Sequence, residues 1–263
     1  MKISIKNNQE IEKMRIAGKL VGKVLDMIKS YIVPDISTVE LNDICHDYIV
    51  YYQKATPACL GYHGFPKSVC ISVNEVVCHG IPNKHQKLKE GDIVNIDVTI
   101  IKNQYYADSS KMFFVGKCHQ KAKNLCKAAK DSLYSTFKII KPGMQLNVIG
   151  NTIQKYICKT PFSIVKEYCG HGIGNNFHED PHILHHKNKF NTIKLQKGMT
   201  FTIEPIINAG NQEVFCEKDG WTVKTKDGSL SAQYEHTILV TESGCEILTL
   251  RETENIHSTY INI

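Results

Sequence analysis

Five residues that could bind metal ions are spread over more than half of the chain: Asp97, Asp108, His171, Glu204 and Glu235. The first of these aspartates follows the largely apolar run 93–96, and the first glutamate follows the similar run 200–203. Burying a carboxylate among such neighbours costs free energy unless it is paired or bound to a cation. Four carboxylates and one imidazole suit Co, Mn, Fe or Zn in hydrolytic sites. The five residues therefore predict a metallohydrolase with two divalent ions.

The helices that must support these residues occur in two similar pairs. Apolar residues at three- and four-residue steps predict a helix over 8–31, and Ser37 with Glu40 predicts a capping box for a second helix. A helix near 120–140 and a shorter one near 148–157 repeat this order. In each pair a proline turn, at Pro34 or Pro142, separates the two helices.

The strands that carry the carboxylates also repeat. Residues 88–97 align with 195–204, so that in both halves a turn glycine precedes a strand that ends in a carboxylate. Asp108 and Glu235 each precede a further apolar strand, and an insertion before the second of them contains Trp221. Loops of this kind often form a lid or wall beside a site. We expect two carboxylates from each half to meet at one central site.

Length and composition agree with one large domain of the α/β or α+β class. The chain has 263 residues, of which 42% are hydrophobic, and we expect residues 1–263 to form a single catalytic domain with an internal repeat of approximately 8–118 and 119–250. The sequence has neither an apolar run long enough for a membrane helix nor a signal-peptide pattern, so a cytoplasmic location is expected. Ten cysteines without a Cys-x-x-Cys pair predict reduced, mostly buried thiols.

Single acidic residues at strand ends are more often turn formers or caps than ligands. The matched placement of two carboxylates in each half shifts the balance toward metal binding, and His171 between glycines would supply the one nitrogen ligand. His79 and His178 are either ordinary loop histidines or donors to an amide or an oxyanion. We favour the donors, because the segment 79–81 resembles 171–173. His182, His185 and His186 are expected to be peripheral.

The net charge of +6 comes almost entirely from lysine, since Arg15 and Arg251 are the only arginines. A weak basic field could favour contact with ribosomal RNA, and general solubility explains it equally well.

Five linked motifs resemble those of the type I methionine aminopeptidases, and the resemblance covers essentially the whole chain. The motifs lie at residues 61–68, 74–82, 168–178, 200–205 and 231–237. The start of the chain directly at the first helix favours a bacterial-type member, without an N-terminal zinc-binding extension.

This resemblance implies the α+β pita-bread fold of creatinase and the aminopeptidases, with a central antiparallel sheet, outer helices and pseudo-two-fold halves. It implies removal of the initiator methionine from nascent proteins, preferentially before a small second residue. Asp97 and Asp108 would hold metal, His171 and Glu204 would bind chiefly one ion, and Glu235 would bridge both. The ions would be two among Co, Mn, Fe or Zn.

The resemblance also implies roles for residues that do not bind these ions. His79 and His178 would contact substrate, and Glu204 would also act as general base or proton shuttle. The methionine pocket would be lined by Cys59, Tyr62, Phe65, Cys70, Phe177 and Trp221. A monovalent cation could bind near Asn74, Val76 and Ser231.

The expected partners are the N-termini of nascent polypeptides, with association with the ribosome as an additional expectation. We expect a monomer that binds neither membranes nor a specific nucleic acid. Two rivals share the expected fold. One is a prolidase or aminopeptidase P relative, although such enzymes generally carry an added N-terminal domain. The other is a degenerate binding module, although such proteins usually lose metal ligands.

Overall fold

The computed structural model describes residues 3–189, 192–254, 256 and 259–261. Its helices are α1 (Asn8–Met27), α2 (Thr38–Asp47), α3 (Gln120–Phe137) and α4 (Asn147–Ile157), with short helical turns η1 (Ile28–Tyr31), η2 (Tyr48–Tyr52) and η3 (Tyr62–Gly64). The strands of the first half are β1 (Thr56–Pro57), β2 (Cys70–Val73), β3 (Val76–Cys78), β4 (Ile93–Lys102) and β5 (Tyr105–Phe114). Those of the second half are β6 (Ser163–Ile164), β7 (Gly170–Gly172), β8 (Glu179–Ile183), β9 (Thr200–Ile203), β10 (Ile206–Asn208), β11 (Val214–Cys216), β12 (Val223–Thr225), β13 (Ser231–Gln233), β14 (His236–Val240), β15 (Gly244–Ile247) and β16 (Thr259–Ile261).

The four predicted helices are confirmed, and local sequence explains where they begin. In α1 the Asn7 side chain accepts a hydrogen bond from the Glu10 amide, and the Glu10 carboxylate accepts one from the Asn7 amide. The predicted capping box of Ser37 and Glu40 begins α2 in the same way. Each box satisfies amide groups that the first helical turn leaves unpaired. None of the helices in the described part of the chain is long and apolar enough to cross a membrane.

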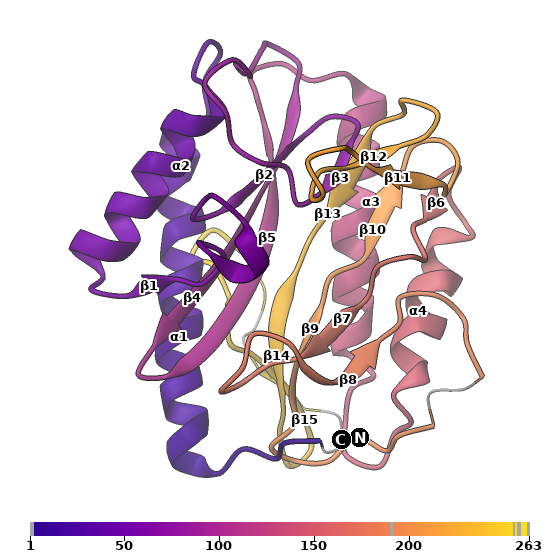
Figure 1. Cartoon of the computed structure of the whole chain (residues 1–263). Coiled ribbons are helices and arrows are strands. Elements are labelled where there is room, and N and C mark those ends of the chain that lie inside the picture. Colours follow the sequence, from indigo (N-terminus) through magenta and orange to yellow (C-terminus); the bar gives the residue numbers. More distant parts are fainter. Residues whose placement is uncertain (1–2, 190–191, 255, 257–258, 262–263) are drawn as a thin grey trace.

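The strands form antiparallel sheets between the two helix pairs. One sheet contains β1, β2, β4 and β5, another has the order β16-β15-β14-β9-β7-β8, and two smaller sheets are β13-β10-β6 and β11-β12-β3. Figure 1 shows α1 and α2 beside the first sheet, and α3 and α4 beside the strands of the second half. Each helix pair packs an apolar core against its own strands. The predicted α+β architecture with antiparallel strands and outer helices is confirmed.

The two halves meet where β5 lies beside the start of β14. The Thr237 hydroxyl donates to the Asp108 carbonyl oxygen at 2.8 Å and accepts from the Asp108 amide at 3.0 Å. The Glu235 amide donates to the Ser110 carbonyl oxygen at 3.1 Å. These contacts hold Asp108 of the first half next to Glu235 of the second half.

The predicted insertion forms a hairpin of β11 and β12, and β12 extends to pair with β3 of the first half. Between the two strands lies Trp221, whose ring packs against Phe65. The insertion is therefore a wall across the two halves, as the sequence predicts. All ten cysteines are free, and seven of them are buried. This agrees with the predicted reduced thiols.

Replacing Ser37 by alanine removes the side-chain acceptor at the start of α2 while the Glu40 side chain stays in place. We expect a loss of about 1 kcal/mol in the free energy of unfolding, measured by urea denaturation. Ser30→Ala is the matched control, because the Ser30 hydroxyl donates to a carbonyl on an exposed turn. Equal effects of the two substitutions would contradict a capping role for Ser37.

Candidate active site

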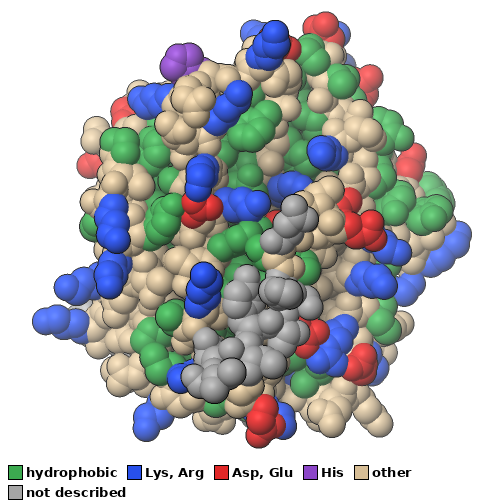
Figure 2. Space-filling view, turned by 180° about the vertical axis from the view of Figure 1, so that it is seen from behind, with side chains coloured by type: hydrophobic (Ala, Val, Ile, Leu, Met, Phe, Trp, Pro, Cys, Tyr) green, Lys and Arg blue, Asp and Glu red, His purple; other side chains and the backbone are tan. Residues whose placement is uncertain are grey.

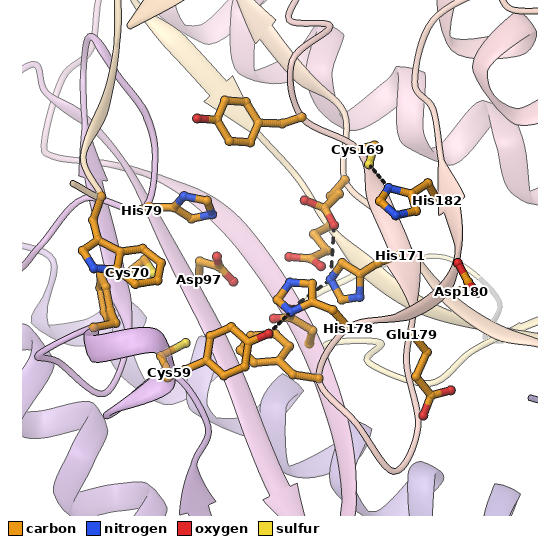
Figure 3. Close-up of a pocket in the computed structure, with 18 residues that line it drawn as sticks. Cys59, Cys70, His79, Asp97, Cys169, His171, His178, Glu179, Asp180 and His182 are labelled. Atoms are coloured by element: carbon orange, nitrogen blue, oxygen red, sulfur yellow. Dashed lines mark hydrogen bonds and ion pairs between the residues drawn. The ribbon is translucent and has the colours of Figure 1, made fainter. Parts of the chain in front are cut away.

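A cavity of about 490 Å³ opens between the two halves and contains all five predicted metal ligands. Its lining consists of Cys59, Tyr62, Phe65, Cys70, His79, Asp97, Asp108, Tyr168, Cys169, His171, Phe177, His178, Glu179, Asp180, His182, Glu204, Trp221 and Glu235. Figure 3 shows the three central histidines, His79, His171 and His178, grouped with Asp97. The structure thus brings together residues separated by more than half of the sequence.

Asp97 and Asp108 lie on neighbouring strands, β4 and β5, and each lies inside its strand. The prediction that the first strand ends at Asp97 and that Asp108 precedes the next strand is therefore wrong, because the β4–β5 hairpin extends beyond both residues. The register pairs Asp97 with Ser110 and Thr99 with Asp108. The two aspartates are therefore diagonal neighbours on one face of the sheet, because side chains two residues apart on a strand point the same way. The Thr99 hydroxyl donates to Asp108 Oδ1 at 2.9 Å, which leaves the other oxygen to face the cavity.

Glu204 and Glu235 lie just beyond the paired ends of β9 and β14. Ile203 pairs with His236, so the antiparallel register carries the two glutamates to opposite positions. The Thr202 hydroxyl donates to Glu204 Oε1 at 2.7 Å, and the Gln233 amide donates to Glu204 Oε2 at 3.3 Å. Each half of the sequence repeat therefore contributes two carboxylates to the lining of the cavity.

His171 lies on β7, where glycines on both sides allow neighbouring strands to approach. A Cβ atom at Gly170 would lie 2.4 Å from the Thr202 carbonyl oxygen, and one at Gly172 would lie 2.2 Å from the Asp180 carbonyl oxygen. The imidazole Nδ1 contacts the Gly172 carbonyl oxygen at 3.0 Å, where it acts as the donor. The Nε2 atom then keeps its lone pair and lies 3.7 Å from Glu204 Oε1 and 3.9 Å from Asp108 Oδ2.

Burial sets the ionisation of these groups. It raises the pKa of Asp97 to about 7 and that of Glu204 to about 8. Burial and then the nearby Asp97 carboxylate raise the pKa of Asp108 well above its usual range, and burial and then Asp108 do the same for Glu235. Burial lowers the pKa of His171 to about 3, so its imidazole is neutral. The cavity therefore disfavours four negative charges unless a cation joins them.

The residues present fit divalent cations. One ligand atom each of Asp108, His171 and Glu235 lies within 4.8 Å of the others. Asp97 Oδ1 and Glu235 Oε1 are buried without a hydrogen-bond partner, and a bound cation would compensate both oxygens. The Nδ1 contact of His171 to a carbonyl oxygen is the usual arrangement behind a metal-binding Nε2 atom. Asp97 and Glu204 line the same cavity and complete the predicted set.

One end of the cavity is apolar. Cys59, Phe65, Cys70 and Phe177 form a buried cluster, against which Tyr62 and Trp221 pack. These are the six residues predicted to line a methionine pocket. The Cys59 thiol contacts the Thr99 hydroxyl at 3.6 Å, so the thiol end lies directly beside the threonine that binds Asp108.

His79 and His178 lie on two sides of the group of ligands. His79 has a positive φ of 54°, and its ring packs edge-on against Tyr168 and Trp221. The ring centroid of His178 is 4.2 Å from that of His171, and its Nδ1 atom lies 2.7 Å from the Tyr62 hydroxyl. Burial lowers the pKa of both histidines, to about 4 for His178. Both are neutral near pH 7.

The prediction that His182, His185 and His186 are peripheral is wrong for two of them. His182 lines the cavity, and its Nδ1 atom contacts the Cys169 thiol at 3.3 Å (Figure 3). His185 is fully buried, and its Nε2 atom accepts a hydrogen bond from the Glu204 amide at 3.1 Å. Both lie on or next to β8, whose pairing with β7 the repeat did not predict.

Arg251 is a further residue that sequence reasoning did not assign to the site, although it is one of only two arginines. It is 1% exposed, and its guanidinium donates to the Ser110 and Glu235 carbonyl oxygens at 2.6 and 3.0 Å. Glu254 pairs with it at 2.9 Å. Arg251 therefore lies behind the cavity and binds backbone atoms of both halves next to two predicted ligands.

The residues predicted to hold a monovalent cation also lie near one another. The Ser231 amide donates to the Asn74 carbonyl oxygen at 2.9 Å, and Val76 starts the strand that follows Asn74. The Ser231 hydroxyl is buried without a hydrogen-bond partner. Binding of a cation there stays a prediction.

The metal-free protein should lose stability as pH rises from 6.5 to 8. The folded carboxyls keep protons that their unfolded forms release near pH 4, so the stability they contribute is lost as pH approaches their raised pKa values. Buried histidines with lowered pKa values oppose this trend only below about pH 6.5. The expected slope is about 1.4 kcal/mol per pH unit for each retained proton.

Thermal unfolding in a chelator, compared with unfolding in Mn²⁺, measures this effect. Bound cations keep the ligands ionised throughout this pH range, so the slope should disappear in the loaded protein. Equal slopes with and without metal would show that these carboxylates do not bind it.

Comparison with known proteins places the chain in a family. Residues 12–242 match metallopeptidase family M24. A methionine aminopeptidase of Buchnera aphidicola subsp. Acyrthosiphon pisum is 63% identical over 263 residues, which is 100% of each chain. The methionine aminopeptidase of Escherichia coli K12 is 59% identical over 97% of each chain. The crystal structure of the Rickettsia prowazekii methionine aminopeptidase aligns with a TM-score of 0.92 at 48% identity and covers 95% of this chain and 100% of that one.

A prolidase from Pyrococcus furiosus shares the fold at a TM-score of 0.72 but only 23% identity, with 94% of this chain and 66% of that chain covered. The fold predicted from the motifs is therefore confirmed as the pita-bread fold shared by these enzymes. The chain belongs to metallopeptidase family M24 and, within it, to the methionine aminopeptidases.

Proposed function

We propose that this chain hydrolyses the first peptide bond of nascent proteins and releases the initiator methionine, preferentially when the second residue is small. The observation that carries this proposal is the adjacency of two features in one cavity. Five metal-binding side chains converge at its centre, and an apolar end with two thiols adjoins them. The relatives named methionine aminopeptidase, with about 60% identity over nearly the whole chain, support the same activity.

Two divalent ions among Co, Mn, Fe and Zn would bind in the cavity. Asp97 and Asp108 would contribute ligands from the first half, and His171, Glu204 and Glu235 from the second. When bound, such a pair of ions lowers the pKa of a water molecule so that it can attack a carbonyl carbon near neutral pH. Availability rather than ligand type decides among these metals, because the carboxylate and imidazole ligands suit several of them.

The protein groups around the ions would handle protons and charge. Glu204 is the proposed general base, since its buried carboxylate can take a proton and pass it to the leaving amine. His178 would donate to the developing oxyanion, and its contact with the Tyr62 hydroxyl fixes the ring that does so. His79, from the opposite side of the cavity, would contact the nitrogen of the scissile amide.

The apolar end would select the first side chain. Methionine is unbranched and its thioether is polarizable, so it fits a narrow cluster of aromatic rings and thiols. Phe65 and Trp221 are edge-on at 5.2 Å between ring centroids and close one side, and Phe177 closes the other beside Tyr62 at 4.8 Å. A preference for a small second residue follows if the histidines crowd the next position of the peptide.

Residues 1–263 would act as one catalytic domain, with the repeat at approximately 8–118 and 119–250. We further propose a cytoplasmic monomer that meets its substrates near the ribosome. Figure 2 shows lysines interspersed with acidic and apolar side chains on the face seen from behind, rather than gathered in one patch. The nascent N-terminus itself would be the recognised partner.

A prolidase-like activity is the rival reaction, and peptide cleavage distinguishes the two. Incubation of the Mn²⁺-, Fe²⁺- or Co²⁺-loaded protein with Met-Gly-Met-Met should release free methionine, detected by mass spectrometry. The Ala-Pro dipeptide, which has the bond that a prolidase cleaves but no N-terminal methionine, should stay uncleaved. Failure to release methionine with all three metals would overturn the proposed function.

Replacing His79 by alanine should separate substrate contact from metal binding. We expect turnover to fall by roughly 100-fold, the usual contribution of one proton-transferring or oxyanion-stabilising group. Two metal equivalents should remain bound, as measured by inductively coupled plasma mass spectrometry. His171→Ala is the matched imidazole change and should lower the metal content. Loss of metal from the His79 variant would identify it as a ligand instead.

A further inference from the structure

Lys6 is a buried lysine at the start of the described chain, far in sequence from the site. It is 4% exposed, and its Nζ atom lies 2.6 Å from Glu179 Oε2. Lysine is almost never buried to this extent unless it is paired. The partner Glu179 lies at the start of β8 and lines the cavity, and in Figure 3 its side chain points away from His171 and Asp97.

The path of the Lys6 side chain depends on two glycines. A Cβ atom at Gly174 would lie 2.3 Å from Lys6 Cε and 2.6 Å from Nζ, so the lysine crosses this residue at close range. The Lys6 amide donates to the Gly198 carbonyl oxygen at 2.8 Å, and Gly198 has a φ of +88°. A side chain at Gly198 would meet the Lys6 carbonyl oxygen at 2.8 Å. The backbone thus holds the lysine directly over the loop that follows β7.

Glu179 connects the lysine to this loop. Its second oxygen, Oε1, accepts a hydrogen bond from the Asn176 amide at 3.0 Å. The Gly174 amide in turn donates to the Asn176 carbonyl oxygen at 3.2 Å, and the Tyr106 amide donates to the Gly174 carbonyl oxygen at 2.8 Å. One carboxylate therefore binds the N-terminal segment with one oxygen and closes the loop over residues 174–179 with the other.

The two residues between these fixed points face the cavity. Phe177 packs against Tyr62 and stacks on Tyr106, and the next residue, His178, contacts the Tyr62 hydroxyl at 2.7 Å. The loop has no helix or long strand of its own to hold these rings. Their positions depend on the ends of the loop, and Glu179 forms one end.

We propose that Lys6 is a positioning residue of the active site. It holds Glu179 so that the loop over residues 174–179 presents Phe177 to the apolar end and His178 to the reacting bond. The consequence for catalysis rests on the proposed function, whereas the effect on the His178 ring does not. A displacement of about 1 Å at a catalytic group can cost roughly 100-fold in rate, so a remote ion pair of this kind can control turnover.

A purely structural role is the alternative, and a paired substitution distinguishes the two. Removing the lysine alone leaves a partly buried carboxylate without its cation, which can destabilise the fold by itself. Lys6→Met with Glu179→Gln removes both charges, keeps the volume of each side chain and leaves an amide oxygen to accept from Asn176. Lys197→Met with Glu242→Gln is the matched control, because that ion pair is exposed at the surface.

The first measurement is steady-state hydrolysis of Met-Gly-Met-Met by the Mn²⁺-loaded variants. We expect kcat to fall by about 10- to 100-fold in the Lys6/Glu179 double variant, with a smaller change in KM and the same metal content. The control should stay within twofold of the parent. The single substitution Lys6→Arg keeps the ion pair with Glu179, so its kcat should stay closer to that of the parent than the kcat of the double variant does. A kcat of the Lys6/Glu179 double variant within twofold of the parent would overturn the proposal.

The second measurement does not require activity. Histidine side-chain ¹⁵N–¹H spectra of the metal-free protein report the contact between His178 and the Tyr62 hydroxyl, with Tyr62→Phe as the reference for its loss. The His178 signal of the double variant should shift in the direction seen for Tyr62→Phe, while the control leaves it in place. An unchanged His178 signal overturns the proposal even if the parent cleaves no methionine peptide.

If the double variant fails to fold, Gly174→Ala tests the same path. The added methyl group must displace Lys6 Cε and Nζ, and it would also approach Glu179 Oε1 at 2.9 Å, so it disturbs both members of the ion pair. The His178 signal should therefore shift in the same direction. A folded Gly174→Ala variant with the parent's spectrum and turnover would overturn the proposal.

Discussion

Burial of four carboxylates in one cavity is the constraint on which the rest of this structure depends. Burial raises the pKa of each of these carboxyl groups. The neighbouring imidazole of His171 is neutral, so it has no positive charge that would offset their negative charges. Four carboxylates this close together are stable only when they bind cations or protons. The scaffold therefore has to hold the carboxylates in place despite the free-energy cost of their burial, and it does so with uncharged donors such as Thr99 and Thr202 and with strand pairing.

Support for the site comes from behind it as well as from within it. The guanidinium of Arg251 binds backbone carbonyls of both halves next to Asp108 and Glu235, and His185 binds the Glu204 amide. These contacts hold the backbone of the predicted ligand residues. They do not occupy the carboxylate oxygens that a cation would bind. A metal site is as rigid as this outer layer of support allows.

The sequence was most informative where the two halves repeat. The pairing of Asp97 with Glu204, and of Asp108 with Glu235, is predicted because the segments 88–97 and 195–204 resemble each other. The helices are predicted because apolar spacing and capping residues are local signals. Arg251 and His185 gave no such signal, since their partners come from distant strands. A near-terminal lysine such as Lys6 is also indistinguishable in sequence from a solvated one, and only the tertiary fold shows that it is buried. The position of His182 could not be predicted because the spacing of His182, His185 and His186 has no match in the first half of the sequence.

The line of contact between β5 and β14, where the two halves meet, affects how the chain folds. The contacts that close it join residues 129 positions apart, as between Asp108 and Thr237, and the pair of Lys6 and Glu179 spans 173 positions. Contacts of such high sequence separation lower the folding rate, because chain entropy is lost before they form. An emerging first half would hold its two aspartates without their partners from the second. A cation that needs ligands from both halves could therefore bind only after β5 and β14 have come together.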